Sequence, residues 1–326
     1  MTTITAKDVS ELRKATGAGM MDCKEALKES GGDFDGALEV LRKKGQKVAA
    51  KRADRETNEG VVVALKNDAG NQAIVLAVSC ETDFVAKNED FIAFANTLAN
   101  HAMEKGVSSA EEFANTEFDG ATVAEKLVER TGKIGEKLEV SDLQVVEGGS
   151  IAQYIHAGSK IGVLVSYKDG GNGEAPQFFR SVAMHIAAMN PSGMVPSELD
   201  LAEVEKATEA LIGQITVENE DRARLGKTLK NVPQYASQLQ LTAEVMAKAE
   251  ADIKEQLKAE GKPEKIWDKI VPGKMERFVA DNTLFDQERC LMSQFFALDD
   301  SKTVADAVKD FQADAEVVEY RRVSVG

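Results

Sequence analysis

The sequence is poor in the residues that build catalytic and metal sites. Its 326 residues include three His, three Cys and one Trp. Cys23, Cys80 and Cys290 are widely spaced, and no histidine lies at ligand spacing from another histidine or cysteine. Zinc-ligand spacing is therefore excluded, and the pattern is typical of reduced thiols in a cytoplasmic protein. We expect no metal site, no cofactor and a cytoplasmic location.

Long apolar runs and an excess of positive charge are also absent. The longest apolar run, residues 73–78, is far shorter than the roughly 20 residues of a membrane-spanning helix. The N-terminal residues carry no apolar leader segment. Lys and Arg total 40 against 55 Asp and Glu, a net charge of −15. Because phosphate backbones are bound by positive surface, we expect neither a membrane nor a nucleic acid as partner.

What is present is enough for a globular fold without recognisable catalytic motifs. Hydrophobic residues make up 43% of the chain, and the length predicts two or three domains. Neither a glycine-rich dinucleotide loop nor a nucleophile elbow occurs. We therefore expect a protein that is not an enzyme. An enzyme that uses Cys80 or His156 is the alternative that the sequence leaves open.

Residues 1–45 predict a domain of three short helices. Thr5 is an N-cap candidate for the first helix, the glycines of residues 16–19 separate the first from the second, and Asp33 can cap the third. Such a unit has a thin core and is marginal by itself. Residues 46–59 are interpreted as a basic linker, or alternatively as a contact strip for an acidic partner. The basic stretch comprises Arg42, Lys43, Lys44, Lys47, Lys51, Arg52 and Arg55.

The middle of the chain predicts a duplicated core. The order strand, turn, strand, loop, helix occurs twice, which indicates two related subdomains with antiparallel hairpins. We assign residues 60–145 to the first, and residues 146–196 and 273–326 to the second. The predicted strands are 61–65, 73–80, 151–157, 160–167 and 315–325, and the helices are 91–104 and 177–190.

Residues 197–272 predict a helical hairpin, or coiled coil, inserted into the second subdomain. Thr242 can cap a helix whose apolar stripe requires a partner: the other arm of the hairpin, or a second copy of the chain through self-association. The stripe comprises Val245, Met246, Ala249, Ile253 and Leu257. With the elements above, the predicted fold class is α+β.

The segment ETDFVAKN (81–88) places an aromatic side chain among charged residues directly after a strand. Phe84 there is either an exposed anchor for a pocket of a partner protein or folds back onto its own core. The residues of this segment alone leave both interpretations open.

Two motifs together resemble the bacterial elongation factor Ts family: LRKATGAGMMDCKEAL (12–27) and ETDFVAKN. Further similar segments follow in the order of the family and cover most of the chain; they are HAGSKIGVLV, VAMHIAAMNP, EGKPEKIWDKIVPGKMERF and SKTVADAV. Compared with shorter members, residues 202–244 look like an addition to the hairpin.

The resemblance implies a guanine-nucleotide exchange factor that binds elongation factor Tu with GDP and accelerates GDP release. It implies that the three-helix unit is of the ubiquitin-associated (UBA-like) type and docks on the G domain of that partner. The implied docking contacts are Leu12, Arg13, Met20 and Met21. The implied contacts that displace the Mg²⁺ ion of the partner are Thr82, Asp83, Phe84 and Val85, and the implied contact of a second face is His156. An adaptor that binds a ubiquitin-like protein through the three-helix unit is the alternative.

Overall fold

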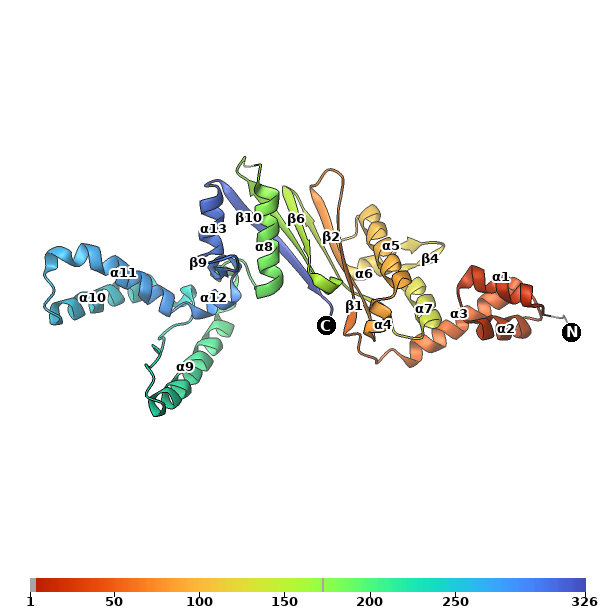
Figure 1. Ribbon diagram of the computed structural model, residues 1–326, viewed down its shortest axis with the longest axis horizontal. Coiled ribbons are helices and arrows are strands. Elements are labelled where there is room, and N and C mark those ends of the chain that lie inside the picture. The colour runs from red at the N-terminus through yellow and green to blue at the C-terminus, as the bar shows by residue number, and fades with distance from the viewer. Residues whose placement is uncertain (1–3, 172) are drawn as a thin grey trace. The chain divides into compact units, whose positions relative to one another are not determined.

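The protein is an α+β protein in a computed structural model that describes residues 4–171 and 173–326 (Figure 1). Residues 1–3, which the sequence analysis placed in the first domain, lie outside the described residues. Two compact units divide the chain. The first contains the described residues up to Ala187 together with Glu316–Gly326, and the second is Ala188–Ala315.

Three helices form the N-terminal part of the first unit: α1 (Ala6–Thr16), α2 (Met20–Glu29) and α3 (Phe34–Lys51). The predicted caps are present, because the side chain of Thr5 accepts a hydrogen bond from the Asp8 N–H and that of Asp33 accepts one from the Gly36 N–H. The helices enclose a small core. It consists of Val9, Leu12, Cys23, Ala26, Leu27 and Ala37.

The stretch predicted as a basic linker is helical as far as Lys51, which corrects the boundary at residue 46. The lysines of this stretch point to solvent, whereas Gly45 is buried against α7 (Val123–Ile134). Residues 46–51 contain Val48 as their one large apolar residue, and for this reason the periodicity of the sequence did not extend the helix past residue 45.

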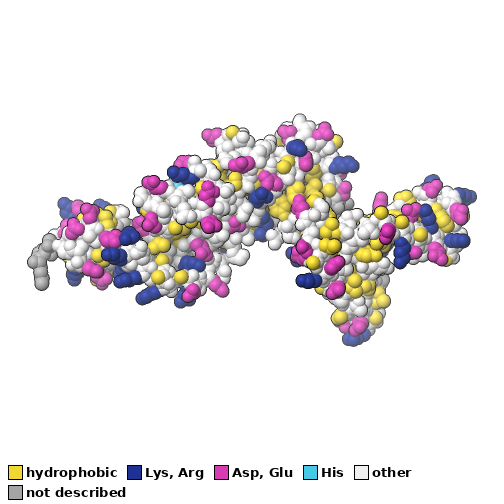
Figure 2. All heavy atoms as spheres, turned by 180° about the vertical axis from the view of Figure 1, so that it is seen from behind, with side chains coloured by type: hydrophobic (Ala, Val, Ile, Leu, Met, Phe, Trp, Pro, Cys, Tyr) yellow, Lys and Arg dark blue, Asp and Glu magenta, His cyan; other side chains and the backbone are white. Residues whose placement is uncertain are grey.

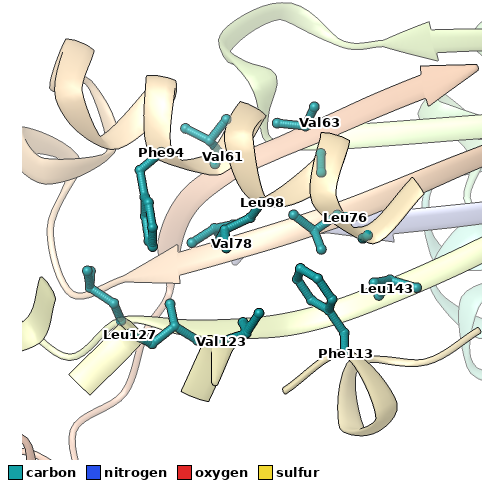
Figure 3. Packing of buried hydrophobic residues seen from close by; sticks show 14 of the residues in the cluster. Val61, Val63, Leu76, Val78, Phe94, Leu98, Phe113, Val123, Leu127 and Leu143 are labelled. Carbon is teal, nitrogen blue, oxygen red and sulfur yellow. The ribbon is translucent and has the colours of Figure 1, made fainter. Parts of the chain in front are cut away.

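A three-stranded antiparallel sheet forms the first part of the core, in the order β1 (Glu59–Lys66), β2 (Gln72–Cys80), β5 (Glu139–Glu147). The remaining elements of this part are α4 (Asp83–Ala86), α5 (Glu89–Lys105), α6 (Ala110–Ala114), β3 (Glu117–Phe118), β4 (Ala121–Thr122) and α7. Apolar residues of α5, α6 and α7 cover one face of the sheet; Figure 3 shows Phe94, Leu98, Phe113 and Leu127 of these helices in the same packed cluster as Leu76 and Val78 of β2. The motif that follows β2 is thus attached to the largest core of the unit.

A second three-stranded sheet has the order β10 (Ala315–Ser324), β7 (Ile161–Asp169), β6 (Ser150–Ile155). A 3-10 turn (Ala157–Ser159) joins β6 to β7, and α8 (Ala175–Met189) follows β7. The two sheets pack face to face through Val62, Val75 and Leu164. Gly162 is required at this interface, because a Cβ there would lie 2.6 Å from Val62 Cγ1 and 2.7 Å from Val75 Cγ2.

The duplication of elements extends further than the sequence analysis indicated. The segments ATVAEKL (121–127) and KTVADAV (302–308) both end a short hairpin and begin a helix. Thr122 with Glu125 and Thr303 with Asp306 form capping boxes at the starts of α7 and α13 (Val304–Phe311). A strand follows each of these helices, so each copy has three long strands, with the helical insertion inside the second.

The second unit contains α9 (Leu201–Arg224), α10 (Ala243–Ala259), α11 (Trp267–Asp281), α12 (Leu284–Arg289), β8 (Phe295–Phe296), β9 (Asp299–Thr303) and α13. Short 3-10 turns lie at Pro196–Glu198, Gln238–Gln240, Glu264–Ile266 and Leu291–Ser293. The apolar stripe of α10 packs on α11 through Ile253, Leu257 and Val271. The helical pair therefore ends at Asp281, past the predicted limit at residue 272, and the other arm covers the part of the stripe at Ile253 and Leu257. A coiled coil in the strict sense stays a prediction.

Candidate functional site

The motif at residues 81–88 forms a short projecting turn at the end of β2. Thr82 is extended, with φ −129° and ψ 154°, and residues Asp83–Ala86 then form the single helical turn α4. Val85 is half-buried and packs on the core of the first sheet, and Ala86 is buried there. The side chain of Phe84 is 83% exposed. The alternative in which Phe84 folds back onto its own core is therefore wrong.

Glu136 anchors the turn through hydrogen bonds with Thr82. Its carboxylate accepts a hydrogen bond from the Thr82 N–H at 3.0 Å and a second from the Thr82 hydroxyl at 2.7 Å. Glu136 directly follows Gly135, which ends α7 with φ 85°, a conformation that favours glycine. Two hydrogen bonds to one carboxylate fix the backbone and the side chain of Thr82 together.

Glu81 anchors the start of the turn to Arg52 and Lys137. Its carboxylate accepts hydrogen bonds from the Arg52 guanidinium at 2.7 and 2.8 Å and from the Lys137 N–H at 2.6 Å. Burial raises the pKa of Glu81, but the hydrogen bonds from Lys137 and Arg52 outweigh burial and leave this pKa below its ordinary value. Glu81 is thus a charged anchor, and its side chain is only 14% exposed.

Asp83 lies at the exposed start of α4. Its carboxylate accepts a hydrogen bond from Lys87 Nζ at 2.7 Å, and this bond is the main cause that lowers the pKa of Asp83. An exposed pair of this kind contributes little to stability. The turn thus carries an exposed Asp83–Lys87 ion pair next to Phe84 in the sequence.

The predicted docking residues fall into two groups. Met20 and Met21 at the start of α2 are 59% and 62% exposed, and Arg13 is also exposed. Leu12 is fully buried in the core of the three helices, so the expectation that it contacts a partner is corrected. Leucine at this position lies on the apolar face of α1, where it holds the helices together.

His156 lies on a different surface, directly after β6. It is exposed, and its Nδ1 lies 3.0 Å from the hydroxyl of Tyr154. The Arg180 guanidinium lies over the ring of Tyr154, 5.4 Å from its centroid. The predicted contact residues thus lie on three separate parts of the first unit, which are Thr82–Val85, the α2 methionines and His156. Together they do not form one pocket.

Cys80 and Cys290 are poor nucleophiles in the folded chain. Burial raises the pKa of both the Cys80 and the Cys290 thiols to about 12, which suppresses the nucleophilic thiolate. In residues 4–171 and 173–326 no group of three or more His, Cys, Asp or Glu is placed to hold a metal ion, and no helix is long and apolar enough to cross a membrane.

Acidic and basic side chains are interspersed over the three-helix part, at the left of Figure 2. In the basic stretch, Arg42 pairs with Glu39, Lys44 with Asp22 and Arg52 with Glu81. Lys47, Lys51 and Arg55 of the same stretch are exposed at four-residue spacing, so a contact strip for an acidic partner stays a prediction. Arg52 contributes to the anchoring of the motif.

Sequence reasoning missed Arg52, Glu136 and Lys137. Arg52 is 29 residues from Glu81 and Glu136 is 54 residues from Thr82. Their proximity depends on the packing of α3 and α7, and the sequence carries no local signal of it. Glu81, the first residue of the motif, was the one available clue.

Comparison with known proteins shows relatives that are similar over the length of the chain. The sequence model of the family described as elongation factor TS matches residues 81–326, beginning at Glu81. Elongation factor Ts of Rhodopirellula baltica is 64% identical over 100% of both chains, and that of Flavobacterium johnsoniae is 48% identical over 100% of both. The protein of the same name from a Sulfurovum species is 44% identical over 98% of this chain and 93% of its own length. These similarities span the chain from end to end, and the chain belongs to the elongation factor Ts family of translation elongation factors.

Proposed function

We propose that this chain binds elongation factor Tu in its GDP form in the cytoplasm and accelerates the release of GDP. The observation that carries the proposal is the exposed ring of Phe84 on a turn held by Glu81 and Glu136. A large apolar side chain that is exposed and fixed in direction is suited to enter a pocket of another protein.

In the proposed mechanism, Thr82–Val85 enter the G domain near the nucleotide and displace the Mg²⁺ ion of the partner. A divalent ion is the largest local positive charge at a diphosphate, so its displacement weakens the hold on GDP. Exchange factor and GDP then bind antagonistically, and by linkage each weakens the other by the same factor. This chain contributes no bond chemistry.

The free energies require more than one contact surface. A tenfold effect corresponds to about 1.4 kcal/mol, and full burial of one Phe supplies about 1.5–3 kcal/mol. A large acceleration therefore needs further contacts. Exposed Met20 and Met21 on α2 with Arg13 on α1, and His156 at the second sheet, are the proposed additional surfaces. Methionine adapts well to a partner surface.

The test is the release of a fluorescent GDP analogue from elongation factor Tu, measured with and without the full chain. We expect release to accelerate in a saturable manner as the chain is added. Unchanged release would refute the proposed function. Binding of a ubiquitin-like protein in a parallel pull-down, without binding of elongation factor Tu, would support the adaptor alternative instead.

A further inference from the structure

Two helices of the first unit end at the motif that carries Phe84. Helix α3 ends at Lys51, and the next residue, Arg52, binds Glu81. Helix α7 ends at Ile134, and Glu136, the second residue after it, binds Thr82. The residues that flank Phe84 on its N-terminal side are thus held by the C-terminal ends of two different helices.

The same two helices join the three-helix part to the core. Gly45 on α3 and Gly132 on α7 meet where the helices pack, and a Cβ on Gly132 would lie 2.4 Å from Gly45 Cα. Backbones in such close contact leave little freedom for sliding or tilting. The α3–α7 pair therefore connects the exposed methionines of α2 to the turn of Phe84 without an intervening flexible linker.

We propose that Glu136 and Arg52 are positioning residues, which fix the direction of the Phe84 turn relative to the α3–α7 pair so that both contact surfaces reach the partner as one rigid body. The inference rests on the proposed function. Neither residue has to touch the partner. Each acts through a residue of the turn, Glu136 through Thr82 and Arg52 through Glu81.

The hydrogen bonds indicate that Glu136 and Arg52 contribute unequally to the position of the turn. Glu136 accepts two bonds from Thr82 itself, one of them from the backbone. Arg52 binds Glu81, which Lys137 also holds through its backbone N–H. Loss of Glu136 therefore leaves the N–H and the hydroxyl of Thr82 without their acceptor, and only its carbonyl oxygen stays bonded, to the Ala86 N–H and Cys80 Sγ. Loss of Arg52 leaves the Glu81 carboxylate its bond from the Lys137 N–H. We expect the larger effect from the Glu136 variant.

The experiment measures the release of fluorescent GDP from preloaded elongation factor Tu as a function of the concentration of full-length chain. Glu136→Ala is expected to lower the rate at saturation about tenfold, which corresponds to about 1.4 kcal/mol, and to leave the half-saturating concentration within about twofold. Arg52→Ala is expected to lower the saturating rate less. Glu147→Ala is the matched control, since this exposed glutamate of β5 accepts a hydrogen bond from the Gln72 side chain at 2.8 Å, away from the turn of Phe84.

A double-mutant cycle tests whether Glu136 acts through Thr82. Thr82→Val removes the hydroxyl. In the double variant with Glu136→Ala, the fold-decrease in the saturating rate of GDP release is expected to be clearly smaller than the product of the two single fold-decreases. Should Glu136→Ala fail to fold, Glu136→Gln keeps one acceptor for the hydroxyl, and an intermediate rate is expected.

Three outcomes would overturn the proposal. They are an unchanged saturating rate in Glu136→Ala, an equal loss in Glu147→Ala, and independent effects of Glu136 and Thr82. If the wild-type chain fails to accelerate release, the proposed function falls and this inference with it. Wild-type acceleration with an unaffected Glu136 variant refutes the positioning role alone.

Discussion

Gly45 on α3 and Gly132 on α7 face each other with no side chain between their backbones. A Cβ on Gly132 would come within 2.4 Å of Gly45 Cα, and one on Gly45 would lie 3.5 Å from the Val128 carbonyl oxygen. Glycine normally weakens a helix interior by about 1 kcal/mol relative to alanine. Here the pair permits a close helix crossing that joins the three-helix part to the core.

Gly132→Ala is expected to destabilise the first unit by about 1–3 kcal/mol, because the added methyl group forces the two backbones apart. The measurement is urea unfolding followed by circular dichroism. The fluorescence of Trp267, the only tryptophan, reports on α11 in the second unit and is expected to keep its midpoint. Gly213→Ala is the control, since its Cβ meets nothing within 4 Å in α9, and it is expected to stabilise by up to about 1 kcal/mol. Stabilisation by Gly132→Ala would contradict the close crossing.

Phe84→Ala is expected to separate folding from function. Because the ring is 83% exposed, the free energy of unfolding should change by less than about 0.5 kcal/mol. The accelerated release of GDP should slow by about 10–100-fold, the amount that corresponds to the burial of one Phe. Leu298→Ala, which removes another exposed apolar side chain, is the control for exchange. An exchange rate equal to wild type would exclude the wedge role.

Glu81 gives the stability of the first unit a defined acid dependence. Its pKa in the folded chain lies below the ordinary value of 4.5, so the charged carboxylate stabilises the fold above that pH, and this contribution is lost as the pH falls through the lower folded pKa. Glu81→Gln is therefore expected to be less stable than wild type at neutral pH. The difference should shrink below about pH 4.5 and stay constant from about pH 6 to about pH 8. A difference that grows on acidification would refute the assignment.

The cysteines are expected to be inert in the folded chain. All three are buried, and the pKa of Cys80 and of Cys290 is raised to about 12 by burial. A thiol reagent at about pH 8 should label none of them before unfolding and all three after it, because the thiolate is the reactive form. Cys80→Ser should retain exchange activity. Rapid native labelling at Cys80, with loss of activity, would revive the enzyme alternative.

Local sequence signals predicted many of the elements and the place of the motif. The helix caps at Thr5, Asp33 and Thr242, the paired strands around each turn and the stripe of α10 were visible because they depend on neighbours within a few residues. The motif at 81–88 was visible for the same reason, since an aromatic residue among charges directly after a strand is unusual within one short window.

Predictions failed where packing is carried by small or distant residues. Residues 46–51 looked like a linker because Gly45 contacts α7 without any apolar side chain. Leu12 was expected to contact a partner because the family resemblance implied it, although its spacing from Val9 places both on the buried face of α1. The repeat of TVAE at 122–125 and TVAD at 303–306 is hard to see in the sequence because a helical insertion separates the copies.

The sequence alone determined the family motif and the elements on either side of it. For Phe84 it left two possibilities, an exposed ring or a ring folded back onto its own core. Tertiary structure made the choice for Phe84 and supplied its supports, since Arg52, Glu81, Thr82 and Glu136 come together only when α3 and α7 cross and both end beside β2. The reason is that capping and periodicity arise from contacts a few residues apart, whereas hydrogen bonds across 29 and 54 residues exist only after the chain has closed those loops.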